Sequence, residues 1–200
     1  MLTFRVGICR IRLHFSCFAL LAFCCIFTGI GSGASCLGAV VVHETSHLAA
    51  MVLLGDKVSE ASLSALGLRV MSDKESSLSD TGQAVVSLAG PASNWLCWGA
   101  SIFLGCENTS FANVSLALAL VHSLPVEPLD GGLALRYFLR RMAGEQEAER
   151  ISRGVSVVLL FPLAVLGFLL LLHTKYNYTL LLMSMYLMLY LVFGWDYTQP

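Results

Sequence analysis

Long apolar runs separated by short polar segments dominate this 200-residue chain. A helix needs about 20 mostly apolar residues to cross a bilayer. Six runs approach or exceed that length, at about residues 13–30, 36–54, 84–104, 111–139, 155–172 and 176–193. The pattern therefore predicts an all-α polytopic membrane protein with six transmembrane helices.

The first run has a second interpretation. Arg5, Arg10 and Arg12 precede it and small residues follow it at 31–35, which is also the arrangement of a cleavable signal peptide. The run is long enough to span a membrane, and more apolar runs follow it. We therefore favour a transmembrane helix over residues 13–30.

The fourth run is interrupted at residues 125–132. Pro125 and Pro128 lack backbone N–H donors, and Gly131 and Gly132 lack side chains. Such a segment predicts a broken fourth helix, whose freed backbone groups must line an enclosed or water-filled cavity.

A polar segment at residues 55–82 separates the second run from the third. Apolar and polar residues alternate in it, with the apolar ones at positions 61, 63 and 65 and again at 66, 68 and 70. This alternation is a weak signal for a small β-hairpin after the second helix, and an irregular loop fits it equally well.

Composition and charge agree with a membrane protein. Hydrophobic residues make up 56% of the chain and charged residues only 12%, whereas about 25% are charged in soluble domains. A net charge of −1 and the lack of a basic patch with interleaved aromatics argue against a nucleic-acid partner. With six helices, every Lys and Arg except Lys175 falls on one side, which predicts cytoplasmic N- and C-termini.

The second run contains the sequence His43-Glu44-Thr45-Ser46-His47, an H-E-x-x-H motif. Residues four apart lie on one face of a helix, so His43 and His47 can present two imidazole nitrogens to one metal ion. Glu44 would lie beside that ion, where its carboxylate can take a proton from water at the metal. Ionisable side chains at membrane depth are costly, which also indicates a functional site.

Asp130, in the interrupted fourth run, is the expected third ligand. Two imidazoles and one carboxylate, with a fourth position open to water, are the usual plan of a catalytic zinc site. Glu127 competes for this role and His122 is a weaker candidate. Asn94, at membrane depth in the third run, either makes hydrogen bonds between helices, contacts substrate or supports a metal ligand from outside.

Three motifs in this order resemble the site-2 protease family of intramembrane zinc metalloproteases. They are H-E-x-x-H at 43–47, G-P-x-S-N at 90–94 and P-x-x-P-L-D-G-G at 125–132. The early metal motif is most similar to the branch typified by stage IV sporulation protein FB. The resemblance implies His43, His47 and Asp130 as zinc ligands, Glu44 as general base and Asn94 near the substrate.

The chain departs from that branch at two points. It has His122 where the family usually has Asn, so we retain His122 as a candidate substrate contact. It also ends soon after the last apolar run, so we expect no cytoplasmic regulatory domain. We expect a single membrane-embedded domain over residues 1–200, with its core at 36–139 and accessory helices at 13–30, 155–172 and 176–193.

The sequence thus predicts a multi-pass zinc metalloendopeptidase of the cell membrane. It would bind one Zn²⁺ and cleave a membrane protein substrate, with a membrane regulatory protein as a further candidate partner. The alternative is a metal transporter or a metal-binding membrane protein without hydrolytic activity, because broken helices occur in transporters too. The lack of repeated halves and the presence of Glu44 favour the protease.

Overall fold

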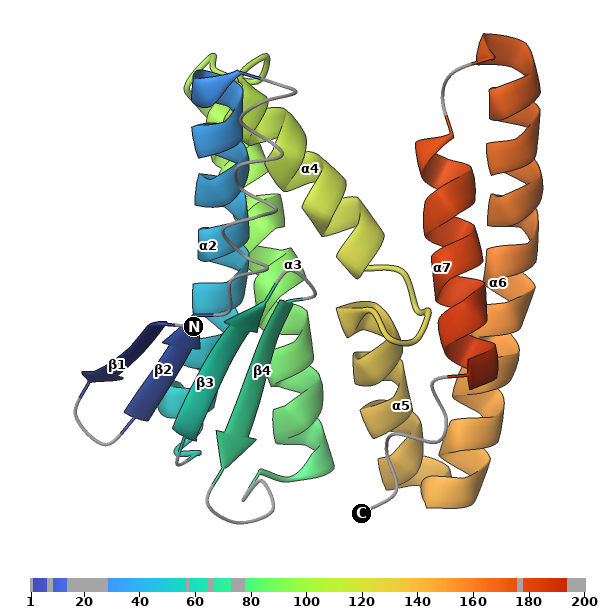
Figure 1. Cartoon of the computed structure of the whole chain (residues 1–200). Helices are drawn as coiled ribbons and strands as arrows, with labels where there is room; N and C mark the ends of the chain where they lie inside the picture. Colours follow the sequence, from blue (N-terminus) through green and yellow to red (C-terminus); the bar gives the residue numbers. More distant parts are fainter. Residues whose placement is uncertain are drawn as a thin grey trace. The chain divides into compact units, whose positions relative to one another are not determined.

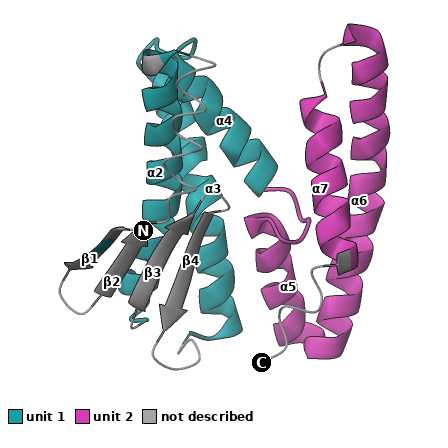
Figure 2. Cartoon of the chain, in the orientation of Figure 1, with its two compact units in different colours: residues 1–122 teal, residues 123–200 magenta. Residues whose placement is uncertain are grey.

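The structure is a computed structural model that describes residues 2–6, 9–13, 29–56, 58–64, 67–72, 78–175 and 178–193. The chain divides into two compact units, unit 1 with residues 1–122 and unit 2 with residues 123–200 (Figure 2). Each unit has its own packed helices. The single domain expected over residues 1–200 stays a prediction.

Unit 1 contains a four-stranded sheet as well as helices. Its strands are, in the order of the sheet, β1 (Leu2–Val6), β2 (Cys9–Leu13), β3 (Val58–Ser64) and β4 (Gly67–Ser72) (Figure 1). The β1–β2 and β3–β4 pairs are antiparallel, whereas β2 and β3 are parallel. The antiparallel β3–β4 pair occupies the segment where alternation suggested a hairpin.

The expectation of an all-α fold is therefore wrong for the N-terminal residues. Arg5, Arg10 and Arg12, which precede the predicted first helix, lie on β1 and β2. The parallel pairing of Arg10 with Glu60 joins strands that are about 50 residues apart. Local alternation carries no information about such a distant partner.

The described part of unit 1 also contains three helices: α2 (Ile30–Leu53), α3 (Asp80–Phe103) and α4 (Ser110–His122). Helices α2, α3 and α4 contact one another, and small residues, Ala39 of α2 and Ala112 and Ala119 of α4, are fully buried in this part of the unit. Helix α3 continues through Pro91 rather than ending there, and α2 packs along it (Figure 1).

Among its described residues, unit 2 contains α5 (Asp130–Ala143), α6 (Glu145–Thr174) and α7 (Thr179–Phe193). Its apolar core is formed by residues from the loop before α5 and from α6 and α7, namely Val126, Leu160, Leu187 and Leu191. Helices α6 and α7 pack tightly, because a Cβ atom on Gly167 would lie only 2.7 Å from the backbone nitrogen of Leu181.

A cluster of charged side chains lies where α5 meets α6. Arg136 and Arg140 donate hydrogen bonds to the Glu145 carboxylate at 2.9 and 3.2 Å. Burial raises the pKa of Glu145, but the two guanidinium groups lower it more, so the net pKa lies below its usual value.

The helices agree with part of the predicted membrane topology. Within the described residues, α2 from Gly31 onward and α6 are long and apolar enough to cross a membrane, and α4 and α7 are apolar but shorter. The break in the fourth run is confirmed, because α4 ends at His122 and α5 begins at Asp130. Most of the predicted first helix, at 13–30, lies outside the described residues, so six spans stay a prediction.

Candidate metal centre

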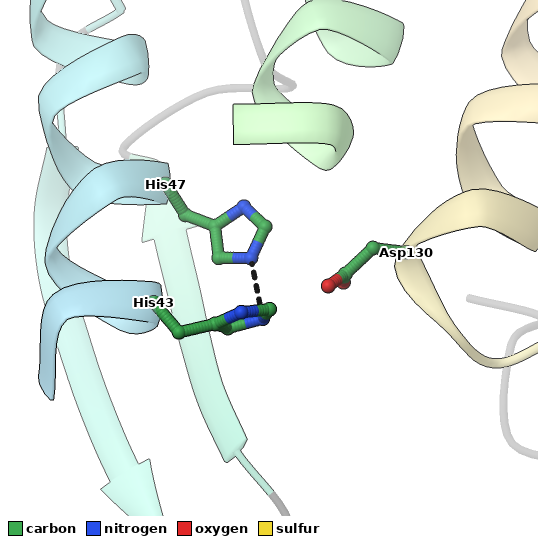
Figure 3. A group of neighbouring side chains, drawn as sticks. All are labelled: His43, His47 and Asp130. Atoms are coloured by element: carbon green, nitrogen blue, oxygen red, sulfur yellow. Dashed lines mark hydrogen bonds between the residues drawn. The ribbon is translucent and has the colours of Figure 1, made fainter. Parts of the chain in front are cut away.

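Two histidines of α2 meet in the interior of unit 1. His43 and His47 are one helical turn apart and are only 3% and 9% exposed. Their Nε2 atoms lie 3.2 Å apart, as the dashed line in Figure 3 shows. The H-E-x-x-H spacing therefore does bring two imidazole nitrogens to one point.

Helix α3 holds the other nitrogen of each ring. His47 Nδ1 donates to the backbone oxygen of Val86 at 2.8 Å, and the Asn94 side-chain nitrogen lies 3.1 Å from His43 Nδ1. Such outer hydrogen bonds fix the orientation and tautomer of metal-binding imidazoles. The structure thus places Asn94 behind His43, where it is fully buried.

Gly90 of α3 leaves room for the two rings. A Cβ atom at this position would lie 2.2 Å from His47 Nε2 and 2.8 Å from His43 Nε2, both closer than real Cβ contacts. The groups that lie against Gly90 are therefore the two imidazoles of α2. The Val86 carbonyl was missed, because every residue carries one and no sequence signal marks it.

Glu44 and His122 are the remaining candidates in unit 1. Glu44 follows His43 on α2 and is half-buried. The ring of His122, at the end of α4, lies edge-on to the His43 ring, with centroids 4.5 Å apart. His43 is therefore in contact with His47, Asn94 and His122, which come from three helices.

In unit 2, the expected third ligand Asp130 is the first residue of α5. Its carboxylate is half-buried, and the N-terminus of a helix favours negative charge. The next two residues, Gly131 and Gly132, have no room for a side chain. A Cβ atom on Gly131 would lie 2.6 Å from the carbonyl oxygen of Leu124. A Cβ atom on Gly132 would lie only 2.3 Å from the carbonyl carbon of Val126. The two glycines therefore let the preceding loop fold tightly against the start of α5.

Glu127, the competing carboxylate, is bound to α6. Ser152 donates to its Oε1 atom at 2.8 Å, and its backbone N–H donates to the Ser156 hydroxyl at 3.0 Å. Both serines are fully buried. The Glu127 side chain thus anchors the loop that precedes Asp130, which makes Asp130 the better candidate for a metal ligand.

The donors fit zinc. His43 and His47 each offer a ring nitrogen and Asp130 a carboxylate oxygen, donor types that zinc binds in catalytic sites. Figure 3 draws the three side chains, the histidines on α2 and the aspartate at the start of α5. In unit 1, the buried Nε2 atoms of His43 and His47 converge beside Gly90, so two ligand atoms for one ion lie close together.

Comparison with known proteins gives a match of fold. No protein-family model matches the chain, and no curated protein matches its sequence. The chain is similar to the solved structure of the Site-2 Protease from Methanocaldococcus jannaschii, with a TM-score of 0.64 and 21% sequence identity. The match covers 93% of this chain and 91% of that chain. The fold is thus that of a site-2 protease, and with the apolar helices it suggests a membrane protein.

Proposed function

We propose that the chain is an intramembrane zinc metalloendopeptidase that cleaves a membrane-embedded or membrane-associated protein. The observation that carries the proposal is the buried pair of His43 and His47, whose Nε2 atoms converge while α3 holds their Nδ1 atoms. The likeness in fold to the Site-2 Protease supports the same function.

In this proposal His43, His47 and Asp130 hold one zinc ion and leave a fourth position open. When bound, zinc polarises a peptide carbonyl and makes water more acidic. Glu127 is not needed as a ligand, because its carboxylate already accepts a hydrogen bond from Ser152.

Glu44 has the proton-transfer role. As the neighbour of His43 on α2, its carboxylate would accept a proton from the attacking water and return it to the leaving amine. His122, whose ring contacts that of His43, would contact the substrate near the reacting carbonyl. The role of Glu44 requires its carboxylate to lie close to His43, and the role of His122 requires its imidazole to lie there. Glu44 is the next residue to His43 on α2, and the His122 ring contacts the His43 ring, which supports both roles.

An extended substrate could pair with the sheet. A helical substrate hides its carbonyls in hydrogen bonds, so the segment to be cleaved must unwind. In the described sheet, β4 has β3 as its one neighbour and therefore offers an edge. Addition of a strand to such an edge is a common way to bind an extended peptide.

We expect a multi-pass protein with cytoplasmic termini, a membrane protein as substrate and a membrane protein as regulator. Membership of the branch of stage IV sporulation protein FB is also proposed, from the motifs alone. The charge distribution and the apolar helices support the membrane location.

A cleavage assay with Glu44→Gln tests the proposal. The purified full chain is placed in liposomes with a panel of single-span reporter proteins, and zinc content is measured beside cleavage. We expect wild type and Glu44→Gln to bind about one zinc per chain, as the three-ligand plan requires, and only wild type to cleave.

Thr45→Ala is the matched control. Thr45 is exposed on α2, and its hydroxyl donates to the Val41 and Val42 carbonyls of its own helix. This variant should bind zinc and cleave like wild type. Cleavage by Glu44→Gln would contradict the role of Glu44. If the wild-type chain carries zinc into the liposomes but cleaves none of the reporter proteins, the result would support the transporter instead.

A further inference from the structure

We propose that unit 2 carries a binding site for the phosphate headgroup of an anionic membrane lipid, on one face of α6 where its apolar part begins. The site is a cavity of about 640 Å³. Residues 146, 149, 150 and 153 give its lining polar side chains, and Gly154, Val157 and Val158 are apolar. None of them belongs to the candidate metal centre, so the inference does not rest on the proposed protease function.

The lining residues form one stripe along α6. They recur every three or four positions, which places them on one face of a helix that is continuous from Glu145 to Thr174 (Figure 1). The polar residues of the stripe precede the apolar ones. An occupant that fits the whole cavity is therefore polar at one end and apolar at the other.

The apolar part of α6 has the length of the hydrocarbon core of a bilayer. Residues 154–173 contain no Asp, Glu, Lys or Arg, and at 1.5 Å per residue this stretch extends about 30 Å. When α6 crosses a membrane, Arg150 and Arg153 thus lie within about one helical turn of the hydrocarbon boundary. Lipid phosphate groups lie at this level.

Two guanidinium groups supply positive charge at the polar end. Arg150 is exposed and makes no hydrogen bond or ion pair with any of the described residues. Arg153 donates a hydrogen bond at 2.9 Å to the backbone oxygen of Leu191 on α7, which restrains its side chain. Because a guanidinium carries five N–H donors, Arg153 can keep this bond and also donate to a phosphate.

One carboxylate in the lining, Glu149, leaves an excess of positive charge. Glu149 is attracted electrostatically to Arg136 of α5. Two guanidinium groups and one carboxylate give the lining a net charge of +1. This charge complements the single negative charge of a phosphodiester, whereas a zwitterionic lipid adds a cationic group beside the arginines.

The apolar end of the cavity is open to acyl chains. A Cβ atom on Gly154 would have no neighbour within 4 Å, and Val157 and Val158 are 46% and 71% exposed. Acyl chains below a phosphate at the arginines would pass Gly154 and pack on the two valines. A free phosphate ion would leave these apolar side chains uncovered, so the cavity fits a lipid better.

Native mass spectrometry of the purified full chain in detergent tests the site. The chain is titrated with phosphatidylglycerol or with phosphatidylcholine of identical acyl chains. We expect wild type to retain one phosphatidylglycerol at least about five-fold more tightly, because one arginine near a membrane surface favours an anionic lipid by about this factor. Arg150→Gln should lose most of this preference. Arg141→Gln is the control with the same change in charge, because Arg141 is exposed on α5 and does not line the cavity.

A second variant blocks the cavity and keeps both arginines. Gly154→Trp fills the open space and should also weaken retention of phosphatidylglycerol. Val165→Trp is its control, because Val165 is 44% exposed on α6 and does not line the cavity. Melting temperatures in detergent show that each variant is folded.

Four results would overturn the proposal. Wild type could retain the two lipids equally, or Arg150→Gln and Arg141→Gln could lose the preference equally, which would indicate charge attraction without a site. Displacement of the lipid by inorganic phosphate alone would indicate a site for free phosphate. Binding of poly-glutamate without any lipid preference would assign this face of α6 to an acidic protein instead.

Discussion

Replacement of Gly90 by alanine is the sharpest test of the geometry around the two histidines. The added methyl carbon would lie 2.2 Å from His47 Nε2 and 2.8 Å from His43 Nε2. The His47 ring would therefore have to move by more than 1 Å, from 2.2 Å to the 3.4 Å of an ordinary contact. The His43 ring, which starts at 2.8 Å, would have to move less, but both shifts would weaken the hydrogen bonds that hold the rings to α3.

Two estimates of the energetic cost agree. Overpacking of a well-packed interior costs about 1–3 kcal/mol. Loss of the two hydrogen bonds that hold the rings, to Val86 and Asn94, costs about 0.5–1.5 kcal/mol each. Because 1.4 kcal/mol is a factor of ten in an equilibrium constant, we expect zinc affinity to fall roughly 10- to 100-fold.

Gly99→Ala is the matched control on the same helix. A Cβ atom at Gly99 would have no neighbour within 4 Å, so this change gains helix propensity without a clash. We expect Gly99→Ala to retain zinc affinity and to melt at or slightly above the wild-type temperature in detergent. Gly90→Ala should melt below it. Equal zinc affinity and equal melting of Gly90→Ala and wild type would refute the reasoning.

Two further predictions concern unit 2. Gly132→Ala should lower the free energy of unfolding by about 1–3 kcal/mol in a denaturant titration, because the added Cβ atom clashes with backbone atoms. Gly154→Ala is the control and should not lower it, because a Cβ atom there has no neighbour within 4 Å. Equal effects of the two changes would contradict the prediction. The lowered pKa of Glu145 means that its pairs with Arg136 and Arg140 stabilise the fold fully above about pH 4.5 and lose this effect as pH falls through the lower folded-state value. The effect should be below about 1 kcal/mol, because the pairs are exposed, and a stability–pH profile unchanged in Glu145→Gln would contradict it.

Sequence reasoning succeeded where a feature depends on residues within one or two helical turns. The spacing of His43 and His47 predicted two imidazoles on one face, and their Nε2 atoms do converge. Prolines and glycines predicted a break before Asp130, and α4 and α5 are separated there. Both depend on helix geometry and on backbone hydrogen bonding, which the local sequence controls.

Sequence reasoning failed, or left alternatives open, where a feature depends on a distant partner. It did not predict β1 and β2, because β2 pairs with a strand far along the chain. It gave Asn94 three alternative roles and gave Glu127 the role of a competing ligand. Only the packing of α3 on α2 places Asn94 against His43, and only the packing of α6 on the loop commits Glu127 to Ser152.

The sequence by itself therefore determined the donor atoms and the helical face that presents them. The tertiary structure decided what supports those donors: the Val86 carbonyl, the Asn94 amide and the bare backbone of Gly90. The physical reason is that a helix fixes the relative positions of residues four apart. A hydrogen bond between helices forms only after packing has brought together residues about 40 or 50 positions apart.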